Sequence, residues 1–188
     1  MRRVGNLPFV DVFLLLLITT LALINPPKEN GKITPQAEMI ISMEWHAESP
    51  DDVDLWIMAP DRQVIGFPFK DAGHTILHRD DLGWANDAVR FEGEEFIINQ
   101  NIEVADLVKT LDGTYVVTAK LFSDRDGNGQ IVTIDLVVLQ PYHKAIEVTI
   151  NLPAAKSEIT AFTFEVKEGK IVAVDTSANI KLSTVGRP

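Results

Sequence analysis

The chain has 188 residues, a formal net charge of −10 at pH 7 and no cysteine. This length allows one sizeable domain with a short additional segment and excludes a large multidomain protein. The acidic balance argues against a nucleic-acid partner, because no cluster of Lys and Arg is present to neutralise phosphates. Without cysteine, disulfides, thiolate metal sites, cysteine nucleophiles and a lipoprotein anchor are excluded.

The N-terminus carries an apolar run over residues 7–24, LPFVDVFLLLLITTLALI. At 1.5 Å per residue this run extends roughly 27 Å, close to the bilayer hydrocarbon thickness of about 30 Å. Arg2 and Arg3 precede the run, so the positive-inside rule predicts a short cytoplasmic N-terminus at residues 1–6 and a transmembrane helix at 7–24. A cleavable signal peptide is the alternative, but the run is long and no small-x-small cleavage site follows it.

A carboxylate, Asp11, lies about one turn inside this expected helix. Intramembrane acids are costly and usually functional, although a position near the headgroups would make Asp11 incidental. Burial raises the pKa of a carboxyl group, so Asp11 can alternate between a neutral and an ionised state in a proton pathway. Thr19 and Thr20 lie two turns further on and are candidate helix-lining residues, although threonine hydroxyls often bond their own backbone.

The segment around Asp11, Asn6-Leu7-Pro8-Phe9-Val10-Asp11-Val12 followed by a leucine run and a closing proline, resembles the start of the ExbD/TolR family. The resemblance covers residues 6–26 and implies that Asp11 carries the coupling ion, H⁺ or Na⁺. It also implies a single-pass inner-membrane homodimer inside a pentameric polytopic partner similar to ExbB, TolQ or the flagellar stator A subunit. The chain would then be a stator-type subunit of an ion-driven motor, not an enzyme, with a periplasmic C-terminal domain and an unidentified envelope partner.

Residues 25–36, NPPKENGKITPQ, contain three prolines and predict a stiff linker. Beyond them, alternating β-branched runs recur and no apolar period of helical length is found, which predicts an all-β, antiparallel sandwich-like exported domain over residues 37–188. A division into 37–141 and 142–188 is the alternative. The expected strands are 38–45, 53–59, 63–66, 88–98, 113–122, 131–139, 145–151, 159–166 and 170–175.

The sequence leaves one part of this domain undecided and predicts another in more detail. Residues 102–111 fit either a short helix or a crossover loop. A tight hairpin is expected where Glu168-Gly169 separates two strands. The exported portions of ExbD and TolR are mixed α/β domains, so an all-β domain does not indicate what the motor would drive.

Residues 124–135 match the spacing of a calcium-binding loop. Oxygen-bearing side chains stand at positions one, three and five, a glycine at six, an aliphatic residue at eight and an aspartate at twelve. A polar hairpin turn is the alternative, because strands are expected on both sides. The candidate calcium ligands are Asp124, Asp126, Asn128, Gln130 and Asp135.

A second acidic group is expected at one end of the sandwich, although separated acidic loops are more often simply solvated. No nucleophile, phosphate-loop or dinucleotide motif is present, which argues against an enzyme. The alternative to the motor is therefore a membrane-tethered β-sandwich binding module for a glycan, a protein or calcium. A virion or secretion-system structural protein is a third possibility. The residues of the second acidic group are Asp51, Asp52, Asp54, Asp80, Asp81 and Asp87.

Overall fold

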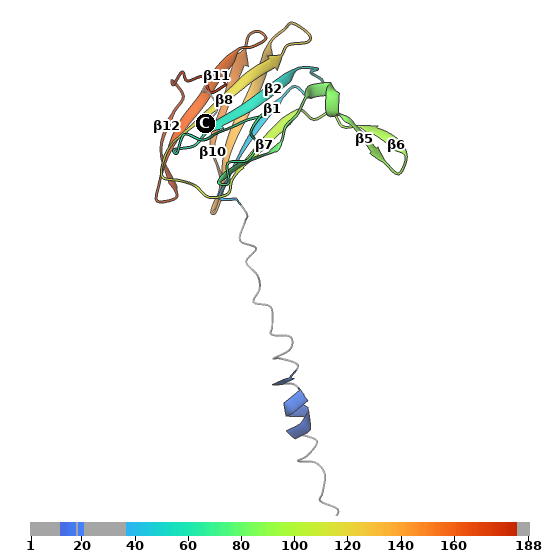
Figure 1. Ribbon diagram of the computed structural model, residues 1–188, viewed down its shortest axis with the longest axis vertical. Coiled ribbons are helices and arrows are strands. Elements are labelled where there is room, and N and C mark those ends of the chain that lie inside the picture. The colour runs from blue at the N-terminus through green and yellow to red at the C-terminus, as the bar shows by residue number, and fades with distance from the viewer. Residues whose placement is uncertain (1–11, 18, 21–36, 184–188) are drawn as a thin grey trace, which may run out of the picture. The chain divides into compact units, whose positions relative to one another are not determined.

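The computed structural model describes residues 12–17, 19–20 and 37–183 (Figure 1). The chain separates into two units, Met1–Thr34 and Pro35–Pro188. Twelve strands and one short 3₁₀ helix follow one another within the described part of the second unit.

The structure corrects the expected transmembrane helix at residues 7–24. Of that segment, residues 12–17 and 19–20 are described and are helical. No helix among the described residues is long and apolar enough to cross a membrane. The predicted fold class is therefore wrong in its N-terminal helix, and its all-β part is confirmed.

Ten of the strands form two five-stranded antiparallel sheets. The sheet that contains β1 has the order β10 (Tyr142–Leu152), β9 (Gln130–Leu139), β1 (Met39–Trp45), β7 (Ile102–Leu107) and β4 (Thr75–Arg79). The sheet that contains β2 has the order β12 (Lys170–Asp175), β11 (Glu158–Lys167), β8 (Gly113–Ser123), β2 (Asp52–Met58) and β3 (Val64–Ile65). We call them the β1 sheet and the β2 sheet.

The two sheets pack face to face around one apolar core. Alternate residues of each strand point to the same side, so every second residue reaches the space between the sheets. Ile41 and Ile134 of the β1 sheet and Leu55 and Phe164 of the β2 sheet are buried in one continuous cluster. Phe164 also stacks on Tyr115 with ring centroids 4.8 Å apart. The domain is therefore a β-sandwich.

Three strand predictions need correction. Residues 88–98 form a hairpin, β5 (Ala88–Phe91) and β6 (Glu94–Ile97), not one strand. The turn residues Glu92 and Gly93 both have positive φ, as a type I′ turn requires. Residues 102–107 are a strand, and β4 was not expected at all. The hairpin at Glu168-Gly169 is confirmed, with both residues at positive φ between β11 and β12.

Loops from both sheets meet at one end of the sandwich. β1 ends where β9 begins, with Trp45 opposite Val132, and β8 ends where β2 begins, with Ser123 opposite Asp52. β4 ends on the same side, because Arg79 lies opposite Val104 near the start of β7. The segments 46–51, 80–87 and 124–129 therefore share this end, which we call the acidic end.

Candidate cation site

Three carboxylates from separate elements meet near the acidic end. Asp54 belongs to β2, Asp80 follows β4, and Glu103 belongs to β7. One carboxylate oxygen from each lies within 4.8 Å of the others. Asp54 is 3% exposed and Glu103 is 0% exposed. We call this group the three-carboxylate cluster.

The local fold explains why an acid is buried at Glu103. β3 pairs only with Ile57 and Met58, so the edge of β2 beyond them has no neighbouring strand. Glu103 fills this gap from the opposite sheet, where its Oε2 accepts a hydrogen bond of 2.7 Å from the backbone N–H of Leu55. Its Oε1 accepts a longer bond of 3.4 Å from the backbone N–H of Asp81. The carboxylate thus binds two backbone donors that no strand satisfies.

The other two members of the cluster have oxygens without partners. Asp54 Oδ2 and Asp80 Oδ1 are buried, and neither accepts a hydrogen bond from a donor group among the residues that the structure describes. Oδ1 of the neighbouring Asp52 is buried in the same state. The side chains of Asp80 and Glu103 are close enough to share a hydrogen bond when one of them is protonated. The second oxygen of Asp80 is 2.8 Å from Lys70 Nζ. Buried polar atoms are normally hydrogen-bonded, so these oxygens indicate room for a ligand that carries positive charge.

The carboxylates of the cluster carry like charges and repel one another. Burial, followed by the negative charges of Asp52 and Asp80, raises the pKa of Asp54 to about 7. Burial also raises the pKa of Glu103 well above its ordinary value, and the charges of Asp54 and Asp80 act in the same direction. The pKa of Asp52 is raised, mainly by burial. These raised pKa values favour the uptake of a proton or a cation by the cluster.

The ligand atoms of the cluster indicate which kind of cation it would bind. All of its side-chain ligands are carboxylate oxygens, and the chain has no cysteine. Hard divalent cations such as calcium and magnesium prefer oxygen ligands, whereas zinc favours nitrogen and sulfur. The two histidines that precede Asp80 in the sequence contact other acids. His74 Nε2 is 2.9 Å from Asp61, and His78 Nε2 is 2.9 Å from Asp106. A calcium-type ion fits these residues best.

A second group, Asp51, Asp124 and Asp126, also brings carboxylate oxygens within 4.8 Å of one another. Its members hold the β8–β9 turn together. Asp51 accepts bonds from the Arg125 backbone N–H and from Gln130 Nε2, at 2.7 and 3.2 Å. Asp124 Oδ1 and Asp126 Oδ1 each accept a backbone N–H within the turn. These contacts account for the group without an ion.

The predicted calcium loop is only partly assembled. Asp124, Asp126 and Asn128 lie in the β8–β9 turn, whereas Gln130 is buried and its Nε2 donates to Ser49 Oγ. Asp135 lies in the middle of β9 and is 2.8 Å from Lys144 Nζ. An extended strand rises about 3.3 Å per residue, which carries Asp135 roughly 16 Å beyond Gln130. The structure therefore does not bring Asp135 to this loop.

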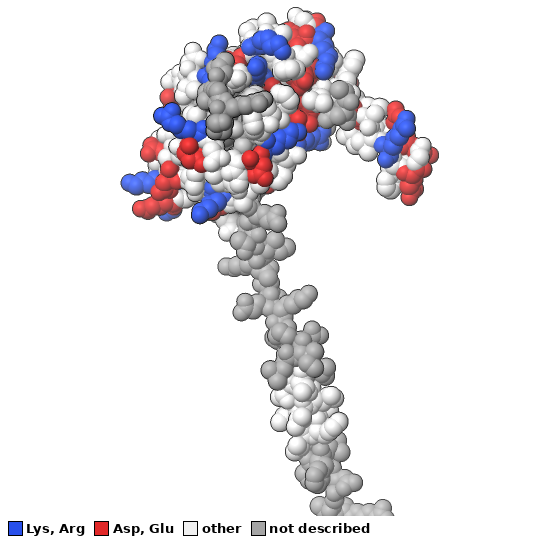
Figure 2. Space-filling view, in the orientation of Figure 1, with Lys and Arg blue, Asp and Glu red and all other residues white. Residues whose placement is uncertain are grey.

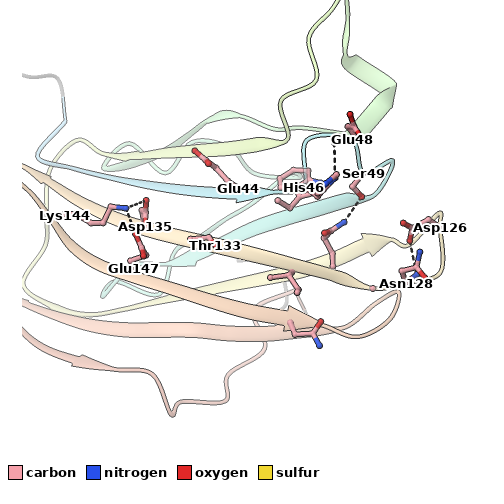
Figure 3. A pocket seen from close by; sticks show the side chains of 15 residues that line it. Glu44, His46, Glu48, Ser49, Asp126, Asn128, Thr133, Asp135, Lys144 and Glu147 are labelled. Atoms are coloured by element: carbon pink, nitrogen blue, oxygen red, sulfur yellow. Dashed lines mark hydrogen bonds and ion pairs between the residues drawn. The ribbon is translucent and has the colours of Figure 1, made fainter.

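The outer face of the β1 sheet carries an open groove of about 1050 Å³ (Figure 3). Strands β1, β9 and β10 line it, together with the end of the β8–β9 turn. Lys144 lies between Asp135 and Glu147, at 2.8 and 2.5 Å. The groove is polar and shallow, and its central charges are paired with one another. It lies apart from the buried three-carboxylate cluster.

The second predicted acidic group does come together in part. Asp54 and Asp80 join the cluster, and the negative charge of Asp81 helps to raise the pKa of both Asp52 and Asp87. Glu103 was missed. Its signal is an acid at an inward position of an alternating strand, since Ala105 and Leu107 point to the same side and are buried.

The structure describes two of the three residues that were predicted to line a proton pathway. Asp11 is outside the described residues. Thr19 and Thr20 are described, and their hydroxyls donate to backbone carbonyls one turn earlier, those of Leu15 and Leu16. The proton-carrying role of Asp11, the polytopic partner and the inner-membrane location stay predictions from the sequence.

Comparisons with known proteins do not place the chain in a family. No protein-family model matches it, and no curated protein matches it. Among solved structures, the "unknown function protein SAV2460" aligns with a TM-score of 0.45 and 13% sequence identity, over 75% of this chain and 90% of that one. A similarity of this size indicates neither a family nor a function.

Proposed function

We propose that the chain is a cation-dependent binding module whose β-sandwich holds one calcium-type ion among Asp54, Asp80 and Glu103. The observation that carries the proposal is the pair of buried oxygens, Asp54 Oδ2 and Asp80 Oδ1, that have no partner among the described residues. Removing one of two paired charges from a buried site strongly destabilises a protein, and three buried acids that share one ion pair, between Asp80 and Lys70, are in a similar situation. A divalent cation would satisfy both oxygens and offset the negative charge of the cluster.

Protons are the competing explanation for the cluster. Asp54 and Glu103 have raised pKa values, so a shared proton would also relieve their repulsion. The two explanations differ in what calcium does. If protons alone neutralise the cluster, calcium has no effect on stability. If the cluster is a cation site, calcium competes with the protons and stabilises the fold.

The position of the cluster suggests what the ion does for binding. It joins β2 and β7, which belong to different sheets, to the segment after β4. Within that segment Asp81 Oδ1 accepts the backbone N–H of Gly83 at 3.0 Å, and Asp81 Oδ2 is 2.8 Å from Arg79. A bound ion would therefore fix the segment 80–87, which leads into β5. The proposed role is to hold one loop surface of the module in a single conformation for a partner.

The test is the melting temperature of the full chain at pH 7.5 in chelator, in calcium and in magnesium. A ligand at a hundred times its dissociation constant adds about 2.7 kcal/mol, which for a chain of this size raises the melting temperature by roughly 5–10 °C. Asp54→Asn should reduce the rise to about half or less, because a tenfold weaker affinity lowers the added stability from about 2.7 to about 1.4 kcal/mol. The matched control is Glu165→Gln on the exposed side of β11, which should keep it. A melting temperature that calcium does not change in the wild-type chain would refute the proposal.

A further inference from the structure

The β5–β6 hairpin projects from the sandwich and packs against little of it (Figure 1). All eight of its strand residues are exposed. An isolated two-stranded hairpin is only marginally stable in water, and three or more strands or a packing partner are needed to stabilise one. We call it the arm. The exposure of the arm therefore indicates that another surface covers it.

The root of the arm is held firmly against the body. Gly83 has φ of +61°, and a Cβ at this position would lie 2.5 Å from the Asp51 carbonyl oxygen, so only glycine permits this close approach. The Arg125 guanidinium donates to the carbonyls of Pro50 and Leu82, which joins the segments on either side. The Ile98 N–H closes the base of the hairpin on the Asp87 carbonyl at 2.9 Å. The body therefore sets where the arm points.

The register of the arm places three of its apolar residues, Val89, Phe91 and Phe96, on one face, whereas Ala88 and Ile97 lie on the other face. Val89 lies opposite Phe96, and directly opposite residues of an antiparallel pair point to the same side. Phe91 is two residues from Val89 and shares that side, where it is 65% exposed, and Phe96 is 49% exposed. Arg90 and Glu95 pair with each other on the other side, at 3.2 Å. The apolar face carries one charged strand residue, Glu94.

The arm's charges argue against a lipid surface as the partner. Glu92 lies in the turn, and Glu94 and Glu95 follow it, so the leading end of the arm is acidic (Figure 2). An acidic tip on a chain of net charge −10 would be repelled by anionic headgroups and is costly to bury in a bilayer. A protein surface that covers the sides of the arm leaves the tip in water.

We infer that the apolar face of the arm is a self-association surface, covered by the same face of a second copy of this chain in a two-fold symmetric dimer. Val89, Phe91, Phe96 and the adjoining Ile98 expose on the order of 400 Å² of apolar surface per copy. Homodimer interfaces are about 65% apolar, so two such faces correspond to a total of roughly 1,200 Å², the lower limit for a stable specific interface. The area available thus matches a weak symmetric dimer. This inference does not depend on the cation site.

Sedimentation equilibrium of the full chain between about 5 and 200 μM tests the dimer, at a range of concentrations suited to an interface of this size. The wild-type chain should dimerise within this range. Phe91→Ser with Phe96→Ser should weaken association at least about a hundredfold, because truncating one central interface aromatic commonly costs tenfold or more. The matched control Tyr142→Ser removes an exposed aromatic on β10 and should leave association unchanged. Circular dichroism and melting temperature establish that each variant is folded.

A cross-linking arm of the experiment locates the contact. The chain has no cysteine, so Val89→Cys introduces a single thiol on the face that the inferred dimer would bury. Its oxidation should give a disulfide-linked dimer much faster than oxidation of Val172→Cys, a control on the exposed strand β12. A wild-type chain that stays monomeric at 200 μM, association that survives the double serine change, or equal cross-linking by both cysteines would overturn the inference.

Discussion

Glu103 Oε2 accepts a 2.7 Å hydrogen bond from the backbone N–H of Leu55, a residue of the opposite sheet that lies 48 positions earlier in the chain. The bond places a fully buried carboxylate beside Asp54, whose own pKa is raised to about 7. One contact thus has two consequences. It satisfies the open edge of β2, and it concentrates negative charge where Asp54 and Asp80 have oxygens without partners.

Two substitutions at Glu103 separate these consequences. Glu103→Leu leaves the N–H groups of Leu55 and Asp81 buried without an acceptor, so the free energy of unfolding should fall by roughly 2–4 kcal/mol. Glu103→Gln keeps an acceptor oxygen and removes the charge, so the chain should retain most of its stability in chelator and lose its response to calcium. Urea denaturation with and without calcium measures both. A Leu variant as stable as the Gln variant would show that the hydrogen bonds contribute little.

Asp54 makes stability depend on pH with a defined sign. Its folded pKa of about 7 lies above its unfolded value, so its carboxyl is protonated in the folded state at pH 4.5 and must ionise in place as the pH rises. When a chelator removes calcium, the contribution of Asp54 to the free energy of unfolding is therefore fully present below about pH 4. It is lost as the pH rises through about 7. Asp54→Asn removes this dependence, so the variant should exceed the wild-type chain by roughly 2–4 kcal/mol at pH 8 and by little at pH 4.5. Equal stabilities at pH 8 would contradict the raised pKa.

The predicted calcium loop and the three-carboxylate cluster are two candidate calcium sites, and they predict different effects of a substitution at Asp135. In the structure Asp135 forms an ion pair with Lys144 at a partly exposed position, and such pairs contribute at most about 1 kcal/mol. Asp135→Asn should change the melting temperature by less than about 4 °C and leave the calcium-dependent rise intact. Loss of that rise in Asp135→Asn, measured beside Asp54→Asn, would restore the loop as the site.

Much of the sandwich follows from local patterns in the sequence. Alternation of apolar and polar residues predicted most strands, and positive-φ turn chemistry at Glu168-Gly169 predicted a hairpin. The same chemistry at Glu92-Gly93 marks the turn of the arm, but a long β-rich run around it suggested one strand. Strand β4 has five residues and was not among the expected strands.

The site was harder to predict because its parts come from both sheets. The sequence grouped Asp54 with Asp80 as acids in loops that could converge, and the fold brings them together. Glu103 depends on where β3 ends, which leaves a backbone N–H at Leu55 without a strand partner. No local pattern encodes that relation. At the N-terminus, apolar composition predicted a spanning helix, whereas no helix among the described residues is long and apolar enough to cross a membrane.

The most direct test of the cation site is the calcium affinity of the full chain at pH 6 and pH 8, measured by isothermal titration calorimetry for the wild-type chain and Asp54→Asn. The account predicts one ion per wild-type chain, bound more tightly at pH 8 because protons on Asp54 and Glu103 compete with it at pH 6. It also predicts an affinity reduced at least about tenfold in Asp54→Asn, the effect of about 1.4 kcal/mol. Absence of binding by the wild-type chain at pH 8, or equal affinity in the variant, would contradict it.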